Sequence, residues 1–250
     1  MRALLVIIFS ATLIWSAYWT IGAQSTKAGV NTWLTEKNEA GFDIHVEDIS
    51  LWGFPNRFDV TITPVWIKAD QWGFAWRSAF LQILRLSYDN DHTIFVFPER
   101  HELKLDERDI TIFSDRMRAS SVSLGGGNRR FVLEAQNLNV QSKNLNYRFG
   151  NVQLAFLLSK DQSKMRLNIT TEDAQPLYRP NSLLLLANLS SKRGLVDEDL
   201  ALFDLRSLLF DSVELRLEEK EIHQDPNLLT FSKLLALPEI LKALDKIKMR

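Results

Sequence analysis

The chain opens with an uninterrupted apolar stretch, from Ala3 to Ala23, that holds no charged residue. At a rise of about 1.5 Å per residue, a helix of roughly 20 apolar residues spans the hydrocarbon core of a bilayer. Trp15, Tyr18 and Trp19 stand toward the far end of the stretch, where amphipathic aromatic rings favour the headgroup layer. The pattern therefore predicts a transmembrane anchor over residues 1–24.

A cleaved secretory signal is the competing interpretation of the same stretch. Arg2 would be its short basic region, and Ile21-Gly22-Ala23 loosely resembles a small-residue cleavage site. Isoleucine is a poor residue at the first of those positions, and the apolar stretch is long for a signal. We therefore expect an anchor that stays attached, with the rest of the chain on the far side of the membrane.

Beyond the anchor a helical period gives way to a period of two. Val30, Trp33 and Leu34 have helical spacing and Gly41 would end that helix, which predicts a membrane-proximal amphipathic helix over residues 25–41. Strict alternation of apolar and polar residues then predicts β-strands. The alternation is clearest at 58–63, 102–106 and 152–156, and further strand-like runs cover 42–51, 76–88, 93–97, 109–113, 118–124, 130–140, 144–149, 164–171 and 212–219.

Turn-forming residues separate these runs, and helices long enough for crossover connections are missing from the pattern. The turns are expected at 52–56, 89–91, 98–100, 114–115, 125–128, 149–151 and 160–163. This order favours an antiparallel meander over a parallel sheet. We predict a mostly β protein whose N-terminal transmembrane helix leads into a curved antiparallel β-meander, a groove or a sandwich, over residues 42–220. Short helices flank it, and a helical C-terminal tail covers 221–250.

Composition and charge exclude several kinds of chemistry. The formal net charge of -1 gives no electrostatic basis for binding nucleic acid. The absence of cysteine excludes disulfides, thiol nucleophiles and Cys-ligated metals. The Gly125–Gly127 run lacks the lysine and helix of a phosphate loop. The four histidines show no zinc-site spacing and are expected to be surface or hydrogen-bonded side chains: His45, His92, His101 and His223. We predict no catalytic residue, no metal, no cofactor and no enzymatic activity.

Residues 52–98 carry a pattern that resembles the family known as domain of unknown function 2125. The pattern consists of Gly53-Phe54-Pro55-Asn56-Arg57-Phe58-Asp59, Trp72-Gly73-Phe74-Ala75-Trp76-Arg77-Ser78-Ala79, and Leu86-Ser87-Tyr88 followed by His92, Ile94 and Pro98. The resemblance extends to about residue 175. It implies an anchored alphaproteobacterial envelope protein of the inner membrane, single-pass, with its main domain in the periplasm, and it supplies no established catalytic residues. A looser architectural similarity links it to AsmA-like proteins, in which a curved antiparallel sheet holds acyl chains.

The alternating strands leave one apolar face, which must be covered by a second layer, a helix, a partner or a ligand. Nine aromatic residues between Trp52 and Tyr88 fit either a sandwich core or the lining of a groove. We predict a non-enzymatic protein that binds or transfers membrane lipid, with Arg57 paired either with Asp59 or with a lipid phosphate. The alternative is a periplasmic scaffold with a closed β core that docks other envelope proteins. The predicted lining residues are Phe58, Val60, Ile62, Ile94, Val96, Leu103, Leu105, Val152, Leu154 and Phe156.

Overall fold

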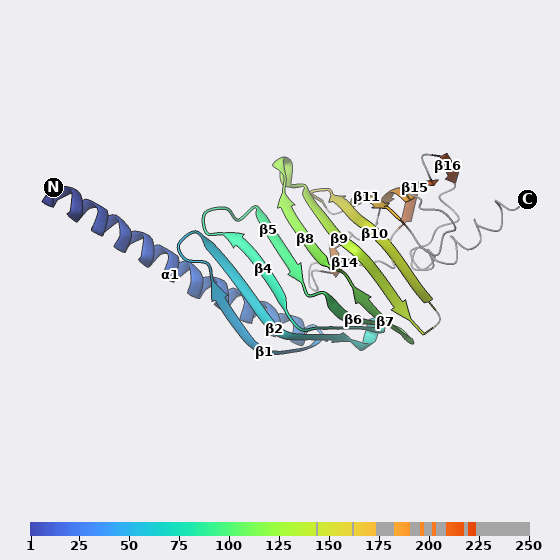
Figure 1. Cartoon of the computed structure of the whole chain (residues 1–250), viewed down its shortest axis with the longest axis horizontal. Helices are drawn as coiled ribbons and strands as arrows, with labels where there is room; N and C mark the ends of the chain where they lie inside the picture. The colour runs from blue at the N-terminus through green and yellow to red at the C-terminus, as the bar shows by residue number, and fades with distance from the viewer. Residues whose placement is uncertain are drawn as a thin grey trace, which may run out of the picture.

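A computed structural model describes residues 1–143, 145–161, 163–173, 183–190, 196–197, 202–203, 209–217 and 220–223. It consists of one long helix followed by β-strands (Figure 1). The elements are α1 (Arg2–Glu39), β1 (Asp43–Trp52), β2 (Arg57–Ala69), η1 (Asp70–Trp72), β3 (Phe74–Ser78), β4 (Leu81–Leu86), β5 (His92–Phe97), β6 (Arg100–Leu105), β7 (Arg108–Phe113), β8 (Arg116–Ser123), η2 (Gly125–Gly127), β9 (Arg129–Ser142), β10 (Leu145–Leu158), β11 (Lys164–Thr171), β12 (Leu183–Ser190), β13 (Val196–Asp197), β14 (Leu202–Phe203), β15 (Leu209–Leu217) and β16 (Lys220–His223). The predicted helical tail beyond residue 223 lies outside the described residues.

Helix α1 is unbroken, so the predicted anchor and the predicted membrane-proximal helix are one element. Residues 2–15 of α1 are all exposed, and the N-terminal part of the helix projects beyond the sheet (Figure 1). Its second half packs on the sheet through a stripe spaced three to four residues apart, the period that aligns side chains along a helix. The less exposed positions of this stripe are Ser16, Trp19, Gly22, Ala23, Thr26, Val30, Leu34 and Lys37. By length and composition, α1 can cross a membrane.

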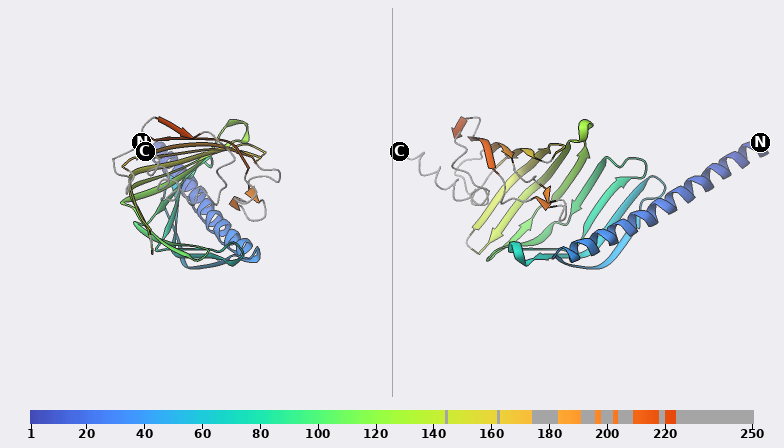
Figure 2. Two further views of the ribbon diagram at one scale, coloured as in Figure 1. Left: turned by 90° about the vertical axis from the view of Figure 1, so that its right-hand side faces the viewer. Right: turned by 180° about the vertical axis from the view of Figure 1, so that it is seen from behind.

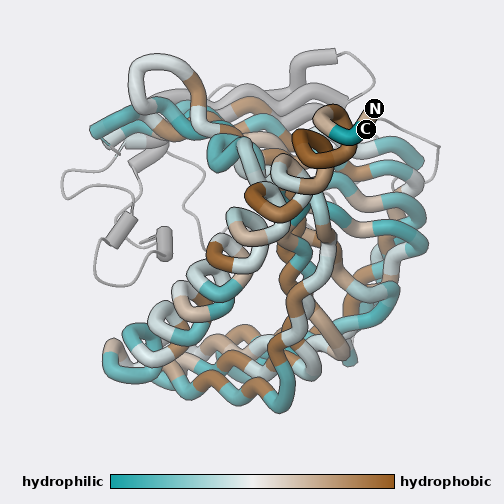
Figure 3. Tube along the Cα trace, turned by 90° about the vertical axis from the view of Figure 1, so that its left-hand side faces the viewer, coloured by the Kyte–Doolittle hydropathy of each residue, from teal (hydrophilic) through white to brown (hydrophobic). Residues whose placement is uncertain are grey.

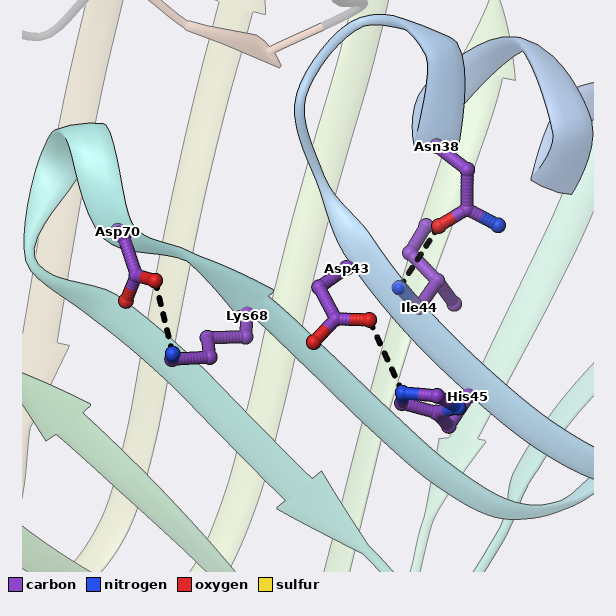
Figure 4. Close-up of polar contacts among 6 residues, drawn as sticks. All are labelled: Asn38, Asp43, Ile44, His45, Lys68 and Asp70. Atoms are coloured by element: carbon purple, nitrogen blue, oxygen red, sulfur yellow. Dashed lines mark hydrogen bonds and ion pairs between the residues drawn. The ribbon is translucent and has the colours of Figure 1, made fainter.

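The junction between α1 and β1 is fixed by local hydrogen bonds. Gly41 has φ +92°, a backbone conformation that residues with a side chain rarely adopt, and it ends the helix as predicted. The Phe42 N–H donates to the Lys37 carbonyl oxygen at 3.1 Å. The Ile44 N–H donates to the Asn38 Oδ1 at 2.8 Å (Figure 4). These contacts hold α1 at one angle to the sheet. The same view draws two exposed ion pairs beside the junction, Asp43 with His45 at 2.9 Å and Lys68 with Asp70 at 2.7 Å.

Fourteen of the strands form one antiparallel sheet. Within it, hydrogen bonds close a circuit of eight strands in the order β2, β3, β6, β7, β9, β8, β5, β4 and back to β2. Strand β1 pairs with the other edge of β2, and β10, β11, β12, β15 and β16 continue outward from β9. The prediction of a mostly β, antiparallel domain is confirmed. The sequence left a groove or a sandwich as alternatives and did not predict this closed circuit.

The circuit arises because three long strands are each interrupted by two residues. β3 and β4 both pair antiparallel with β2, one after the other, and β7 and β8 do the same along β9. The chain therefore keeps its direction at residues 79–80, 98–99 and 114–115. The predicted reversals at Pro98–Arg100 and Ser114–Asp115 are wrong. Turn-forming residues interrupt a strand as readily as they reverse it, and only the pairing of the neighbours distinguishes the two.

The sheet curves so that α1 lies on its concave side (Figure 2). On β2 the buried side chains change phase in the middle of the strand: Val60 and Ile62 are buried before Pro64, and Val65 and Ala69 after it. The pairing with β1 stays in register across this point. Pro64 has no N–H to contribute to the ladder, so the strand is locally irregular there. The buried side chains of β2 therefore have even residue numbers before Pro64 and odd residue numbers after it.

Candidate functional site

One face of the sheet is apolar across eight strands. Residues that are directly opposite in an antiparallel pair project to the same side, so the pairings trace rows of side chains. One row runs through β1, β2, β4, β5, β8, β9, β10 and β11 and holds no polar residue: Leu51, Val60, Ile83, Phe95, Ala119, Leu133, Leu154 and Ile169. We call the side of the sheet that carries this row the apolar face.

The apolar face continues on both sides of this row. Met117, Ala135 and Val152 form the next row with Phe97. The rings of Phe131 and Phe156 stack with their centroids 4.7 Å apart in the row on the other side. That row begins with Phe58 and also holds the polar residues Arg85, Thr93 and Ser121. Beyond the irregularity at Pro64, a further row holds Ile44, Ile67, Trp76, Leu103 and Ile110. The face therefore extends along the strands as well as across them.

Helix α1 covers the apolar face over β1 and β2. Val30 of α1 packs on the cluster of Val60, Ile62 and Val65, and Leu34 packs on a second cluster around Ala69. Farther from α1, most large apolar side chains of the face are only partly buried: Phe95, Phe97, Leu133, Val152, Leu154, Phe156 and Ile169. Figure 3 shows α1 lying across one part of the curved sheet. The face thus combines a packed end next to α1 with a longer stretch of half-buried apolar surface.

Eight of the eleven predicted site residues share this face. They are Phe58, Val60, Ile62, Leu103, Leu105, Val152, Leu154 and Phe156. Ile94 and Val96 lie on the opposite face, because Phe95 and not its neighbours is paired with Ile83. Arg57 also projects away from the apolar face and binds Asp59 at 3.0 Å between Nε and Oδ1. The register therefore corrects the placement of Ile94 and Val96 on the apolar face, whereas Arg57 forms the pair with Asp59 that was one of its two predicted partners.

The opposite face is polar in the row that contains Val96. Its other members are Thr61, Gln82, Arg118, Glu134, Gln153 and Thr170. The Gln153 amide donates to the Glu134 carboxylate at 3.0 Å across β9 and β10. Arg118, Glu134 and Gln153 of this row are exposed. The neighbouring row of the same face is more apolar and holds Leu84, Ile94, Ser120, Val132 and Ala155. The contrast between Phe95 and Val96, or between Leu154 and Gln153, is therefore a contrast between two faces at one place in the sheet.

Sequence reasoning missed several residues of the apolar face. Phe131, Leu133 and Ala135 alternate with polar or smaller residues along β9, so a signal for them was present in the pattern. Phe95 and Phe97 had no such signal, because Ile94 and Val96 between them are equally apolar. Only the pairing partners decide which pair faces inward.

His101 is buried on the apolar face, so it is not a surface histidine, and a hydrogen bond with the Pro98 backbone fits the predicted alternative of a hydrogen-bonded side chain. Its ring lies 6.3 Å from that of Trp76 and 6.1 Å from that of Phe97, between centroids. Burial lowers the pKa of His101 from its ordinary value of 6.5, because an apolar surrounding disfavours the charged ring. Its Nδ1 has no hydrogen-bond partner among the described residues. A neutral His101 adds a polar atom to the face without adding a charge.

The described part of the chain holds no group of three or more metal-ligating side chains. The chemistry that the face itself offers is the burial of hydrocarbon, which stabilises a bound apolar group by about 25 cal/mol for each Å² removed from water.

Comparison with known proteins gives one match. A family model described as "Uncharacterized protein conserved in bacteria (DUF2125)" matches residues 19–201. The match includes most of the packed half of α1 and the strands that carry the apolar face, and it extends beyond residue 175, where the resemblance was expected to end. No curated protein and no solved structure matches the chain. The similarity to AsmA-like proteins stays a prediction from architecture.

Proposed function

We propose that this chain, which belongs to the DUF2125 family of bacterial proteins, is a non-enzymatic membrane-anchored protein that binds or transfers lipid on its apolar face. The N-terminal half of α1 is the anchor, and the folded domain lies on the periplasmic side of the inner membrane. The observation that carries the proposal is the row from Leu51 to Ile169, which is apolar across eight strands and half-buried beyond α1.

Acyl chains fit this surface better than a compact ligand does. The apolar rows cross many neighbouring strands, which lie about 4.8 Å apart, so the face is long as well as apolar. The described residues include no group of three or more metal-ligating side chains. The charged Arg85 on this face is held by the Phe58 ring and by a hydrogen bond to the Thr26 hydroxyl. A long hydrocarbon chain gains free energy in proportion to the apolar area that it buries, without needing specific polar partners.

The anchor is proposed to stay attached. Trp15, Tyr18 and Trp19 each donate a side-chain hydrogen bond to the sheet, and Val30 and Leu34 pack on its core. Cleavage after Ala23 would remove the three donors and the contact of Gly22 with Phe58. These contacts support an anchor that is also a structural part of the domain.

Substitution on the two faces of β10 tests the lipid proposal. We expect Leu154→Asp to abolish the retention of lipid, because it places a charge in the hydrocarbon surface. The neighbouring Gln153→Asp lies on the polar face and should retain lipid at the level of the original protein. The measurement is native mass spectrometry of the full chain, purified from a bacterial envelope. Equal lipid content in two folded variants would refute the assigned lining.

An interaction protein with a closed core is the second candidate, because eight strands do close a hydrogen-bonded circuit. In that case the apolar face is covered by a protein and not by lipid. The same purification distinguishes the two candidates. The scaffold would be favoured if the protein is stable without lipid and copurifies with one defined partner, and if Leu154→Asp releases that partner.

A further inference from the structure

Three side chains from the apolar stretch of α1 donate hydrogen bonds to main-chain carbonyl groups at one end of the sheet. The Trp15 indole N–H donates to the Pro55 carbonyl at 2.9 Å, and the Trp19 indole N–H donates to the Arg57 carbonyl at 2.8 Å. The Tyr18 hydroxyl donates to the Ser87 carbonyl at 2.7 Å. A main-chain carbonyl without a partner is costly inside a membrane, so these bonds suit a segment that enters the apolar phase.

The hydrogen bonds also fix the depth of the sheet relative to α1. A span of about 20 residues that begins at Ala3 ends near Gly22. Trp15 and Trp19 lie seven and three residues before that end, which is about 5 to 10 Å inside it at 1.5 Å per residue. The turn between β1 and β2 lies at the same level, because its carbonyl groups accept these bonds. When α1 spans a membrane, this turn lies inside the membrane boundary.

The side chains at this end of the sheet are unusually apolar for an exposed surface. Outside α1, the large hydrophobic side chains that are exposed in the described part of the chain are Trp52, Phe54, Leu86 and Tyr88, with exposed fractions of 73%, 55%, 36% and 66%. All four lie in or beside the β1–β2 and β4–β5 turns. Amphipathic aromatic rings of this kind favour the interface between headgroups and acyl chains.

We propose that residues 52–56 and 86–90, which we call the lip, are embedded in the headgroup and acyl boundary of the phospholipid leaflet that α1 crosses. The inference rests on α1 acting as the membrane anchor proposed above. Arg57 borders the lip and Asp89 lies within it, and their charges keep it at the boundary and out of the hydrocarbon centre. Leu51 and Phe58, which flank the β1–β2 turn, belong to the apolar face. The lip thus joins the acyl layer of the leaflet directly to the apolar face, and a lipid passes between them sideways.

Site-specific labelling tests the lip, and the chain suits it because it has no cysteine. An environment-sensitive fluorophore is attached to Phe54→Cys and to Tyr88→Cys in the full chain, in nanodiscs of phosphatidylethanolamine and phosphatidylglycerol. Leu13→Cys on the projecting part of α1 reports the membrane, and Glu107→Cys in the exposed β6–β7 turn reports water. The readouts are quenching by nitroxide-labelled lipid and by aqueous iodide. Circular dichroism confirms that each variant is folded.

The proposal expects the labels at positions 54 and 88 to be quenched by nitroxide lipid and protected from iodide, as at position 13, with the opposite result at 107. If position 13 is in lipid while 54 and 88 behave like 107, α1 spans the membrane but the lip stands clear of it, and the inference is overturned with the anchor intact. If position 13 is also accessible to iodide, the proposed anchor fails, and the lip fails with it.

Discussion

His101 is an ionisable side chain buried among the aromatic rings of the apolar face. Its pKa is lowered by burial in the folded chain, whereas an unfolded chain has the ordinary value near 6.5. As the pH falls through 6.5, the unfolded chain takes up a proton that the folded chain does not. The free energy of unfolding therefore decreases below that pH.

We expect His101→Phe to reduce this loss of stability between pH 7 and pH 5, because phenylalanine fills a similar volume and cannot be protonated. The measurement is the melting temperature in mild detergent at the two pH values, for the original protein and the variant. An identical decrease in both proteins would contradict the assignment of the pH dependence to His101.

Gly53 is constrained by the β1–β2 turn. It has φ +108°, and a Cβ atom there would lie 2.8 Å from both the Cβ and the carbonyl oxygen of Arg57. We expect Gly53→Ala to destabilise the domain by about 1–3 kcal/mol, the usual cost of a strained backbone position. Gly125→Ala is the matched control, since nothing lies within 4 Å of its Cβ position. Denaturant unfolding of both variants measures the difference, and equal stability would show that the turn relaxes freely.

At the same scale, single residues show where sequence reasoning stopped. Val60, Leu103 and Leu154 lie on the apolar face, as the alternation with polar neighbours along each strand indicated. Val96 was misplaced because four consecutive residues of β5 are apolar, and alternation cannot choose between the two parities. Its true face follows from its pairing with Gln82 and Arg118, which are long-range contacts.

Among the elements, α1 has two kinds of surroundings along its length. Residues 2–15 are exposed and mostly apolar, while the stripe from Ser16 to Lys37 packs on the sheet. The sequence predicted both halves but divided them, because the helix changes from uniformly apolar to amphipathic near residue 24. A change in the pattern of apolar residues along a helix reflects a change in what surrounds the helix, and it does not require the helix to break.

The contact between Gly22 and Phe58 tests the packing of α1 on β2. A Cβ atom at Gly22 would collide with the buried ring of Phe58, whereas one at Gly29 would meet nothing within 4 Å. We expect Gly22→Val to weaken the docking of α1 by about 1–3 kcal/mol, as overpacking usually does. Gly29→Val should have little effect. Limited proteolysis between residues 24 and 41 reports the docking, and equal cleavage of the two variants would argue against this contact.

The sequence could predict where the strands lie, but it could not predict where the chain reverses between them. Period-two alternation marks β2, β6 and β10 in the sequence. The interruptions at 98–99 and 114–115 resemble turns locally, and the one at 79–80 falls inside a single predicted strand at 76–88. Because β3 and β4 both lie along β2, the chain continues straight between them. Whether the chain continues or reverses is decided by pairing with the partner strand, which a local sequence pattern does not reveal.

For the whole molecule, we propose that the apolar helix, the lip with its exposed hydrophobic side chains and the long apolar face form one path for lipid. The helix and the family were predictable, because apolar length and the motifs of residues 52–98 are local features. The closed circuit of strands and the position of the lip beside Trp15 and Trp19 depend on contacts 38 and 40 residues apart in the sequence. No single-sequence pattern fixes such contacts.

The central claim is that the apolar face holds lipid in a membrane, and photo-crosslinking from adjacent residues tests it most directly. A benzophenone amino acid is placed at Phe95, on the apolar face, or at Val96, on the polar face, in the full chain in bacterial membranes. After illumination, mass spectrometry identifies the attached molecules. The account predicts covalent phospholipid on the protein labelled at position 95 and little on that labelled at 96. Equal labelling at the two positions, or attachment of a protein alone at position 95, would contradict it.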